Sequence, residues 1–236
     1  MYRIIPVIVL IISFLIGGTG DDIISKDSAF KYSIKENGNG LIRYSMPDYS
    51  FESTDGSNGK IYKKPILLDA SHIAEPGQPD LPSNSSFIAI DPSKSYSLLV
   101  SVISSQITEN VEITPKASWD NDAEESLNEN VEYNSEEFYP NNIAILSEPM
   151  TMREMTIANL TVTPFRYYPE EKRLEEFTEI EVELVETGVV ENTVFRPAKR
   201  SRAFEPLYKS MIANYSSLER DNIPYQRPSI LYILPS

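Results

Sequence analysis

Cysteine is missing from this sequence, and histidine occurs only once, at His72. Without cysteine the chain forms no disulfide, has no thiolate nucleophile and cannot bind a metal through sulfur. A single histidine cannot build a multi-histidine metal site, and a catalytic histidine needs a nucleophile and an orienting group beside it. We therefore interpret His72 as a surface or loop side chain, and we expect the chain to hold no cofactor.

Positive charge is also scarce. The 236 residues include 21 Lys and Arg against 35 Asp and Glu, which gives a formal net charge of −14. Nucleic-acid binding requires a basic surface, so we expect no nucleic-acid partner. Hydrophobic residues make up 41% of the chain, which is enough for a sizeable core.

Motifs that carry chemistry are missing as well. The chain has no glycine-rich phosphate loop, and the Gly-Asn-Gly at 38–40 has the form of a hairpin turn. Residues 120–131 begin like a calcium loop, but Glu125 and Val131 stand where such a loop requires glycine and glutamate. Paired carboxylates occur by chance in so acidic a chain. We therefore predict that the chain has no catalytic residues of its own.

Long apolar runs are limited to the N-terminus. Arg3 precedes an apolar run from Ile4 to Gly17, and small residues follow. This pattern is typical of a secretory signal peptide, which we assign to residues 1–20. The run is short for a membrane span, which needs ~20 apolar residues, although an uncleaved anchor is the alternative. We expect a secreted, periplasmic or cell-surface protein that does not contact the membrane after signal cleavage.

After the signal sequence, polar and apolar side chains mostly alternate with a period of two. Residues 30–46 predict a hairpin around an Asn-Gly turn, because that dipeptide adopts the turns that match strand twist. Residues 86–105 predict two strands around a Pro-Ser-Lys turn. These patterns indicate a mostly β fold.

The clearest predicted hairpin covers residues 153–186, with a turn at Tyr-Pro-Glu-Glu. In its second strand Ile180, Val182 and Leu184 alternate with three glutamates. One aliphatic face beside one acidic face indicates a strand that is buried on one side only. We therefore predict an antiparallel β-sandwich over residues 21–195.

The C-terminal part of the chain departs from the alternating pattern. Residues 196–203 are basic, and residues 204–215 carry apolar side chains at spacings of three and four, typical of an amphipathic helix. The expected buried face consists of Phe204, Leu207, Tyr208, Met211 and Tyr215. We predict a basic linker and one docking helix over residues 196–226.

A proline-rich segment precedes one predicted strand. Three prolines occur within residues 76–82, directly before the apolar stretch that contains Phe87, Ile88 and Ile90. Proline reduces the freedom of the unfolded chain and favours extended backbone, so we expect the segment to guide these residues into a sheet in register. An ordinary proline-rich surface loop is the alternative interpretation.

Several segments, taken in order, resemble the N-terminal propeptide domain of gingipain-type cysteine peptidases, family C25. They are GQPDLP (77–82), VEITP (111–115), FYPNNIAILSEP (138–149), TPFRYYP (163–169), EFTEIEVEL (176–184) and FEPLYKSMIANY (204–215). The final residues, 227–236, resemble the truncated start of the caspase-like catalytic domain that follows in that family. The resemblance implies a propeptide that keeps its zymogen latent, assists folding and is released by proteolysis. The implied partner is its own cysteine peptidase domain, which this chain lacks.

The family blocks its specificity pocket with a basic side chain on the loop after the strand that matches VEITP. The candidate inhibitory loop here contains Lys116, Trp119, Asp120 and Asp122. Asp122 best matches the basic position of the family, and an acidic side chain cannot pair with an acidic pocket. Either Lys116 fills the pocket, or the peptidase has another specificity, or latency works by covering alone. We favour covering.

Release requires accessible cleavage sites. The candidate processing sites are Lys199, Arg200, Arg202 and Arg220. Exposed basic linkers are good protease targets, although a solvated charge cluster would have the same sequence.

A free-standing cell-surface β-sandwich that binds glycan or peptide is the alternative function. In that case aromatic side chains would stack on the ligand, and the candidates are Trp119, Tyr133 and Tyr139.

Overall fold

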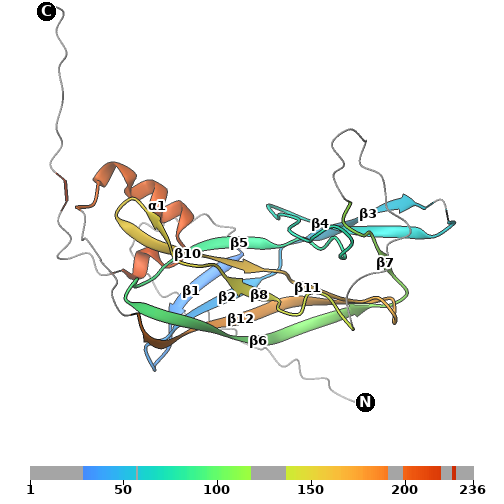
Figure 1. Ribbon diagram of the computed structural model, residues 1–236, viewed down its shortest axis with the longest axis horizontal. Coiled ribbons are helices and arrows are strands. Elements are labelled where there is room, and N and C mark those ends of the chain that lie inside the picture. Colours follow the sequence, from blue (N-terminus) through green and yellow to red (C-terminus); the bar gives the residue numbers. More distant parts are fainter. Residues whose placement is uncertain (1–28, 57, 118–136, 191–198, 219–224, 227–236) are drawn as a thin grey trace, which may run out of the picture.

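The computed structural model describes residues 29–56, 58–117, 137–190, 199–218 and 225–226. Within these ranges the chain forms strands almost throughout, with one short α-helix near the C-terminal end (Figure 1). The predicted mostly β fold with a single amphipathic helix is therefore confirmed.

The largest sheet is antiparallel and is organised around one long strand. Its members are β1 (Phe30–Ile34), β2 (Gly40–Ser45), β6 (Lys94–Thr108), β11 (Phe165–Tyr168) and β12 (Arg173–Val189). Strand β12 pairs with β6 along one edge and with β2 and β11 in succession along the other, and β1 extends the sheet beyond β2.

Two smaller sheets lie against the first one. The second sheet contains β5 (Asn84–Ala89), β8 (Ala144–Leu146), β9 (Met150–Met152) and β10 (Met155–Val162). The third contains β3 (Tyr49–Asp55), β4 (Ile61–Leu67) and β7 (Glu112–Ile113). All strand pairs are antiparallel except β4–β7, which is parallel. Figure 1 shows the second and third sheets side by side over the β6–β12 layer.

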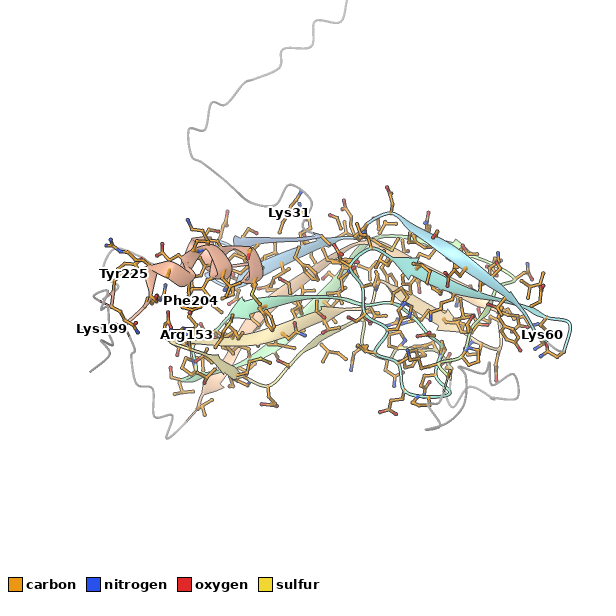
Figure 2. The ribbon with its side chains drawn as sticks, turned by 90° about the horizontal axis from the view of Figure 1, so that it is seen from above. Lys31, Lys60, Arg153, Lys199, Phe204 and Tyr225 are labelled. Atoms are coloured by element: carbon orange, nitrogen blue, oxygen red, sulfur yellow. The ribbon has the colours of Figure 1, made fainter. Side chains whose placement is uncertain are left out.

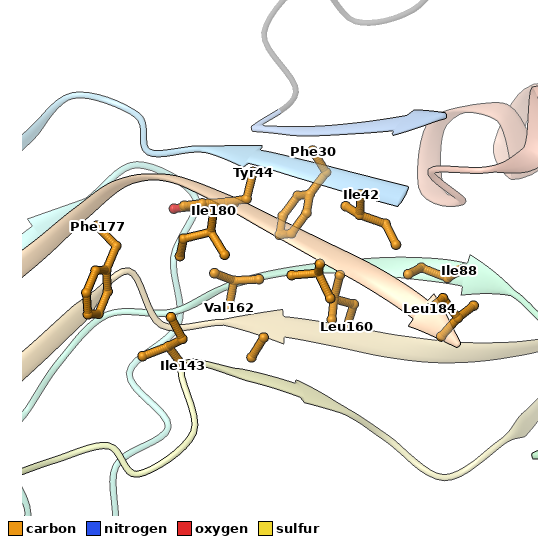
Figure 3. Packing of buried hydrophobic residues seen from close by; sticks show 12 residues of the cluster. Phe30, Ile42, Tyr44, Ile88, Ile143, Leu160, Val162, Phe177, Ile180 and Leu184 are labelled. Atoms are coloured by element: carbon orange, nitrogen blue, oxygen red, sulfur yellow. The ribbon is translucent and has the colours of Figure 1, made fainter. Parts of the chain in front are cut away.

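The main core lies between the first two sheets (Figure 3). Ile180 and Val182 of β12 are fully buried there, opposite Leu160 and Val162 of β10. Tyr44 adds a polar link, because its hydroxyl donates to Oδ1 of Asn84 at 2.7 Å. The alternation read from the sequence thus places aliphatic side chains inside the sandwich, as expected for strands with one buried face.

One glutamate on the opposite face of β12 forms hydrogen bonds with the β1–β2 turn. Glu183 accepts hydrogen bonds from Lys35, Asn37 and Asn39 in the β1–β2 turn, at 2.5, 3.0 and 2.7 Å. The bonds from Lys35, Asn39 and Asn37 lower the pKa of Glu183 to about 2. The predicted Asn-Gly hairpin is confirmed, and its turn is also fastened to the central strand.

The predicted hairpin over residues 153–186 is shorter than expected. Strands β11 and β12 form it around the turn at residues 169–172, whereas β10 pairs with β5, β8 and β9 in the second sheet. The chain changes sheets at Thr163-Pro164, where proline cannot continue a ladder of backbone hydrogen bonds. Strands β5 and β6, expected around one turn, likewise belong to different sheets.

The helix docks on the outer face of the second sheet. Helix α1 (Glu205–Met211) follows the 3-10 turn η1 (Arg202–Phe204) and precedes the 3-10 turn η2 (Tyr215–Ser217). Tyr208 and Tyr215 are buried as predicted, but Leu207 is 42% exposed and Ile212 is buried in its place. The helix ends at Met211, so it is shorter than the helix predicted over residues 204–215, and Ile212 and Tyr215 reach the cluster from the segment that follows it.

Several predictions lie outside the described residues, namely the signal peptide at 1–20 and the terminal segment at 227–236. Among the residues that the structure describes, no helix has the length and apolar character that crossing a bilayer requires. Within the same residues, no three His, Asp or Glu side chains gather closely enough to hold a metal ion.

Replacing Leu160 by Ala tests the main core. Leu160 is fully buried, so its truncation should lower the free energy of unfolding by roughly 2 to 5 kcal/mol. Leu99→Ala is the matched control, because Leu99 is 58% exposed on β6 and its loss should change stability by less than ~0.5 kcal/mol. Urea titration of both variants measures the two values, and equal values would contradict the described packing.

Candidate functional site

A buried carboxylate joins three parts of the chain next to the candidate inhibitory loop. Asp80 lies in the proline-rich segment, and its side chain is only 4% exposed. Its oxygens lie 2.9 Å from Lys64 Nζ of β4, 2.9 Å from His72 Nδ1 and 3.7 Å from Lys116 Nζ. We call Lys64, His72, Asp80, Lys116 and Tyr139, described below, the loop base.

Backbone hydrogen bonds fix the same place. The amide of Asp80 donates to the carbonyl of Thr114 at 2.9 Å, and that of Lys116 donates to Gln78 at 2.8 Å. Gly77 returns a bond to the carbonyl of Lys116 at 3.0 Å. The proline-rich segment is therefore paired with residues 114–116, which lead into the candidate loop. Lys116 cannot shift without breaking these bonds.

The local sequence explains the shape of the segment. Glu75 to Gln78 form a tight turn closed by a 3.0 Å bond from the Gln78 amide to the Glu75 carbonyl. Pro76 takes the second position of this turn and Gly77 the third, with φ of +86°. A turn with positive φ at its third position requires glycine there and favours proline before it. Proline and glycine thus serve the loop base as well as the entry into β5.

The charges of the loop base stabilise the ionised form of Asp80. Burial alone would raise the pKa of this carboxyl, but the hydrogen bonds from His72 and Lys64, with their charges, lower the pKa of Asp80 to about 2. The hydrogen bond from His72 requires a proton on Nδ1. The sole histidine therefore lies in a loop, as predicted, and acts as a structural partner of the aspartate.

The far end of the candidate loop is held beside the same cluster. Tyr139 exchanges two backbone hydrogen bonds with Tyr167 of β11, at 2.9 and 2.8 Å, and packs against the second core cluster. Burial, together with the charges of Glu75 and Asp80, raises the pKa of Tyr139. The two described ends of the candidate loop, at Lys116 and at Tyr139, are therefore both held by backbone hydrogen bonds to the domain.

The structure places part of the predicted inhibitory loop. Lys116 is at the loop base with its ammonium toward Asp80, whereas Trp119, Asp120 and Asp122 lie outside the described residues. Tyr139, proposed as a stacking residue in the alternative function, is half-buried and paired with β11. The sequence analysis did not identify Asp80 and Lys64 as site residues. The position of a charged aspartate between Pro79 and Pro82, next to an apolar stretch, is the feature that could have pointed to Asp80.

The predicted processing sites differ in exposure. Lys199 and Arg202 are exposed, while Arg200 is half-buried and its carbonyl accepts a 2.8 Å bond from the amide of Gln226. Arg220 lies outside the described residues. These four residues remain predicted sites.

An open cleft of about 640 Å³ lies at the helix end of the molecule, where Arg200 contributes to its wall. Its acidic side chains already have partners in this chain: Asp91 accepts from Ser93, Glu154 from Tyr208 and Glu186 from Lys94. We therefore place the candidate site at the loop base and not in this cleft.

Antiparallel sheets that enclose a core, with one helix docked near the C-terminal end, define a mostly β sandwich domain. A family model described as Propeptide_C25 matches residues 27–217. The chain therefore belongs to the C25 propeptide family, which confirms the resemblance seen in the sequence.

Relatives with curated descriptions are gingipains of Porphyromonas gingivalis. Gingipain R2 is 29% identical over 184 residues, which cover 75% of this chain and 25% of the relative. Gingipain R1 is 27% identical over 180 residues, which cover 74% of this chain and 18% of the relative. This chain thus spans a quarter or less of these proteins.

Two solved structures share the fold. The complex of Porphyromonas gingivalis RgpB pro- and mature domains matches with a TM-score of 0.64 and 26% identity, over 81% of this chain and 99% of that one. A structure on the zymogenic latency of gingipain K matches with a TM-score of 0.52 and 17% identity, over 69% of this chain and 96% of that one, and supports the fold alone.

Replacing Asp80 by Asn tests the electrostatics of the loop base. The pKa of Asp80 falls from 3.8 to about 2 on folding, so the charged form should contribute about 2 kcal/mol of stability at neutral pH. Because the folded-state pKa is depressed, this contribution is present above pH ~4 and is lost as the pH falls toward 2.

The stability difference between the wild-type chain and D80N should therefore shrink over that pH range. Urea unfolding at a series of pH values measures it. Asp48→Asn, at an exposed aspartate, is the control. A difference between wild type and D80N that does not change with pH would contradict the assignment.

Proposed function

We propose that this domain is the propeptide of a gingipain-like cysteine endopeptidase, that it keeps the zymogen latent and assists its folding, and that proteolysis releases it. Membership of the C25 propeptide family supports this proposal. So does the likeness to the RgpB prodomain, which is described in complex with its mature domain. The proposed partner is a caspase-like cysteine peptidase domain, and the predicted signal peptide supports secretion or exposure at the cell surface.

The observation that carries the proposal is the loop base. Ordering a chain segment on binding costs conformational entropy, and that cost weakens binding. Here both described ends of the segment are held: Lys116 by a backbone hydrogen bond to Gln78 and by the carboxylate of Asp80, and Tyr139 by two backbone hydrogen bonds to Tyr167. Fixed ends reduce the number of conformations available before binding, so the loop base prepares the segment to cover a partner.

The position of Lys116 favours covering over pocket filling. Its ammonium lies 3.7 Å from the carboxylate of Asp80, and its side chain is 21% exposed. Inserting Lys116 into a distant pocket would remove one of the two lysine ammonium groups that lie near this buried carboxylate, which is unfavourable. We therefore assign Lys116 an anchoring role, and keep Trp119, Asp120 and Asp122 as the residues proposed to meet the peptidase.

A double-mutant cycle on inhibition tests this function. Purified wild-type domain should inhibit the mature domain of a gingipain R relative. Lys116→Met should raise the inhibition constant by about 10-fold, and Asp80→Asn by at least as much, because Asp80 also contacts Lys64 and His72. The double variant should be little weaker than Asp80→Asn alone, because that variant has already lost the contact with Lys116. Lys209→Met, at an exposed position on α1, is the control.

Two outcomes would contradict parts of the proposal. If the folded wild-type domain fails to inhibit, the latency role is wrong. If Lys116→Met abolishes inhibition while Asp80→Asn retains it, then Lys116 fills the pocket and the anchoring role is wrong. Thermal unfolding of each variant separates loss of binding from loss of fold.

A further inference from the structure

The segment around the helix covers the outer face of the second sheet. We call residues 203–218 the latch. Its buried side chains pack on those of β10 in one cluster, each at most 5% exposed: Met155, Ile157, Tyr208, Ile212 and Tyr215. The rings of Tyr208 and Tyr215 are 5.7 Å apart. Burial of large apolar side chains is favourable, so this cluster attaches the latch to the sheet.

The latch also seals an edge of the sheet. Strand β5 is an edge strand, and the amide of Ala213 donates to the carbonyl of Phe87 at 2.9 Å. Asn214 is buried, and its side-chain amide bonds both the N–H and the carbonyl of Ala89, each at 2.8 Å. An uncovered edge strand presents unpaired backbone groups, so removal of the latch would leave β5 open.

Further contacts tie the N-terminal half of the latch to its neighbours. Tyr208 donates to the buried carboxylate of Glu154 at 3.0 Å, and the guanidinium of Arg153 lies 4.0 Å from the ring centre of Phe204. Beyond the latch, Tyr225 donates to Glu205. Figure 2 shows Arg153, Phe204, Tyr225 and Lys199 together at one end of the molecule.

The latch residues that make these contacts follow three candidate processing sites, Lys199, Arg200 and Arg202, in the chain. We propose that the latch stays bound to the outer face of the β5–β10 sheet after the chain is cut at Lys199, Arg200 or Arg202. Cleavage there leaves two chains that remain one folded unit. Separation then requires the latch to leave its face, which is a second step with its own free energy.

The three processing sites differ in how accessible they are to a protease. Cleavage needs an extended segment that enters the protease. Lys199 is exposed, whereas the carbonyl of Arg200 is bonded to Gln226, and the amide of Ser201 donates to Glu154 at 3.2 Å. Arg202 begins η1, and its guanidinium lies 4.7 Å from the ring centre of Tyr225. Lys199 is therefore the site that a protease reaches first.

The test uses the full chain with a recognition sequence for a sequence-specific viral protease inserted directly after Lys199. After complete cutting, size-exclusion chromatography at micromolar concentration should return both fragments in one peak. Tyr208→Ala combined with Ile212→Ala should weaken the association of the fragments by ~100-fold or more, because two buried side chains are lost. Leu207→Ala, at the exposed position of the same helix, should leave the association unchanged.

Asn214→Ala gives a milder second variant in case the double variant fails to fold. It should weaken association by ~10-fold, since it leaves the backbone of Ala89 without partners. Separation of the cut wild-type fragments would overturn the proposal, as would equal behaviour of Asn214→Ala and Leu207→Ala. The experiment contains no peptidase, so its failure would not affect the proposed latency function.

Discussion

Strand β12 is the element on which the rest of this domain depends. It pairs with three strands over its length, and its side chains enter two of the three cores: Ile180, Val182 and Leu184 in the first and Leu174 in the second. Each such burial contributes ~1.5–3 kcal/mol, against a backbone entropy loss of ~1–2 kcal/mol per ordered residue. Without β12 the first sheet would lose its centre, and the other sheets would have no common surface on which to pack.

The loop base is connected to β12 through β11. Tyr167 pairs with Leu174 in the ladder, bonds the backbone of Tyr139, and its hydroxyl donates to the carbonyl of Val111 at 3.0 Å. Val111 leads through β7 to Lys116. The residues that flank the candidate loop are therefore both connected to the β11–β12 ladder. Asp80 adds an ionic contact with Lys116 to this packing.

Local patterns in the sequence predicted individual elements well. The Asn-Gly turn located β1–β2, and the alternation at Ile180, Val182 and Leu184 identified the buried face of β12. Pairing between distant segments could not be predicted, because alternation is the same whether β10 pairs with β12 or faces it across the core. The Asp80 cluster was missed for a related reason: the side chains around the carboxylate come from positions 64, 72 and 116, and no short motif connects them.

The loop base and the latch lie at opposite ends of the domain, as Figure 1 shows for β7 and for α1. On the proposed function, the loop meets the peptidase from one end, while the latch at the other end belongs to the downstream chain once the linker is cut. Two separate attachments between the same two bodies reinforce each other, because each keeps the other at a high effective concentration. A single cut in the linker removes neither attachment. Lasting separation therefore requires that both the loop and the latch leave their partners, so the latch adds a step that cutting the linker does not complete.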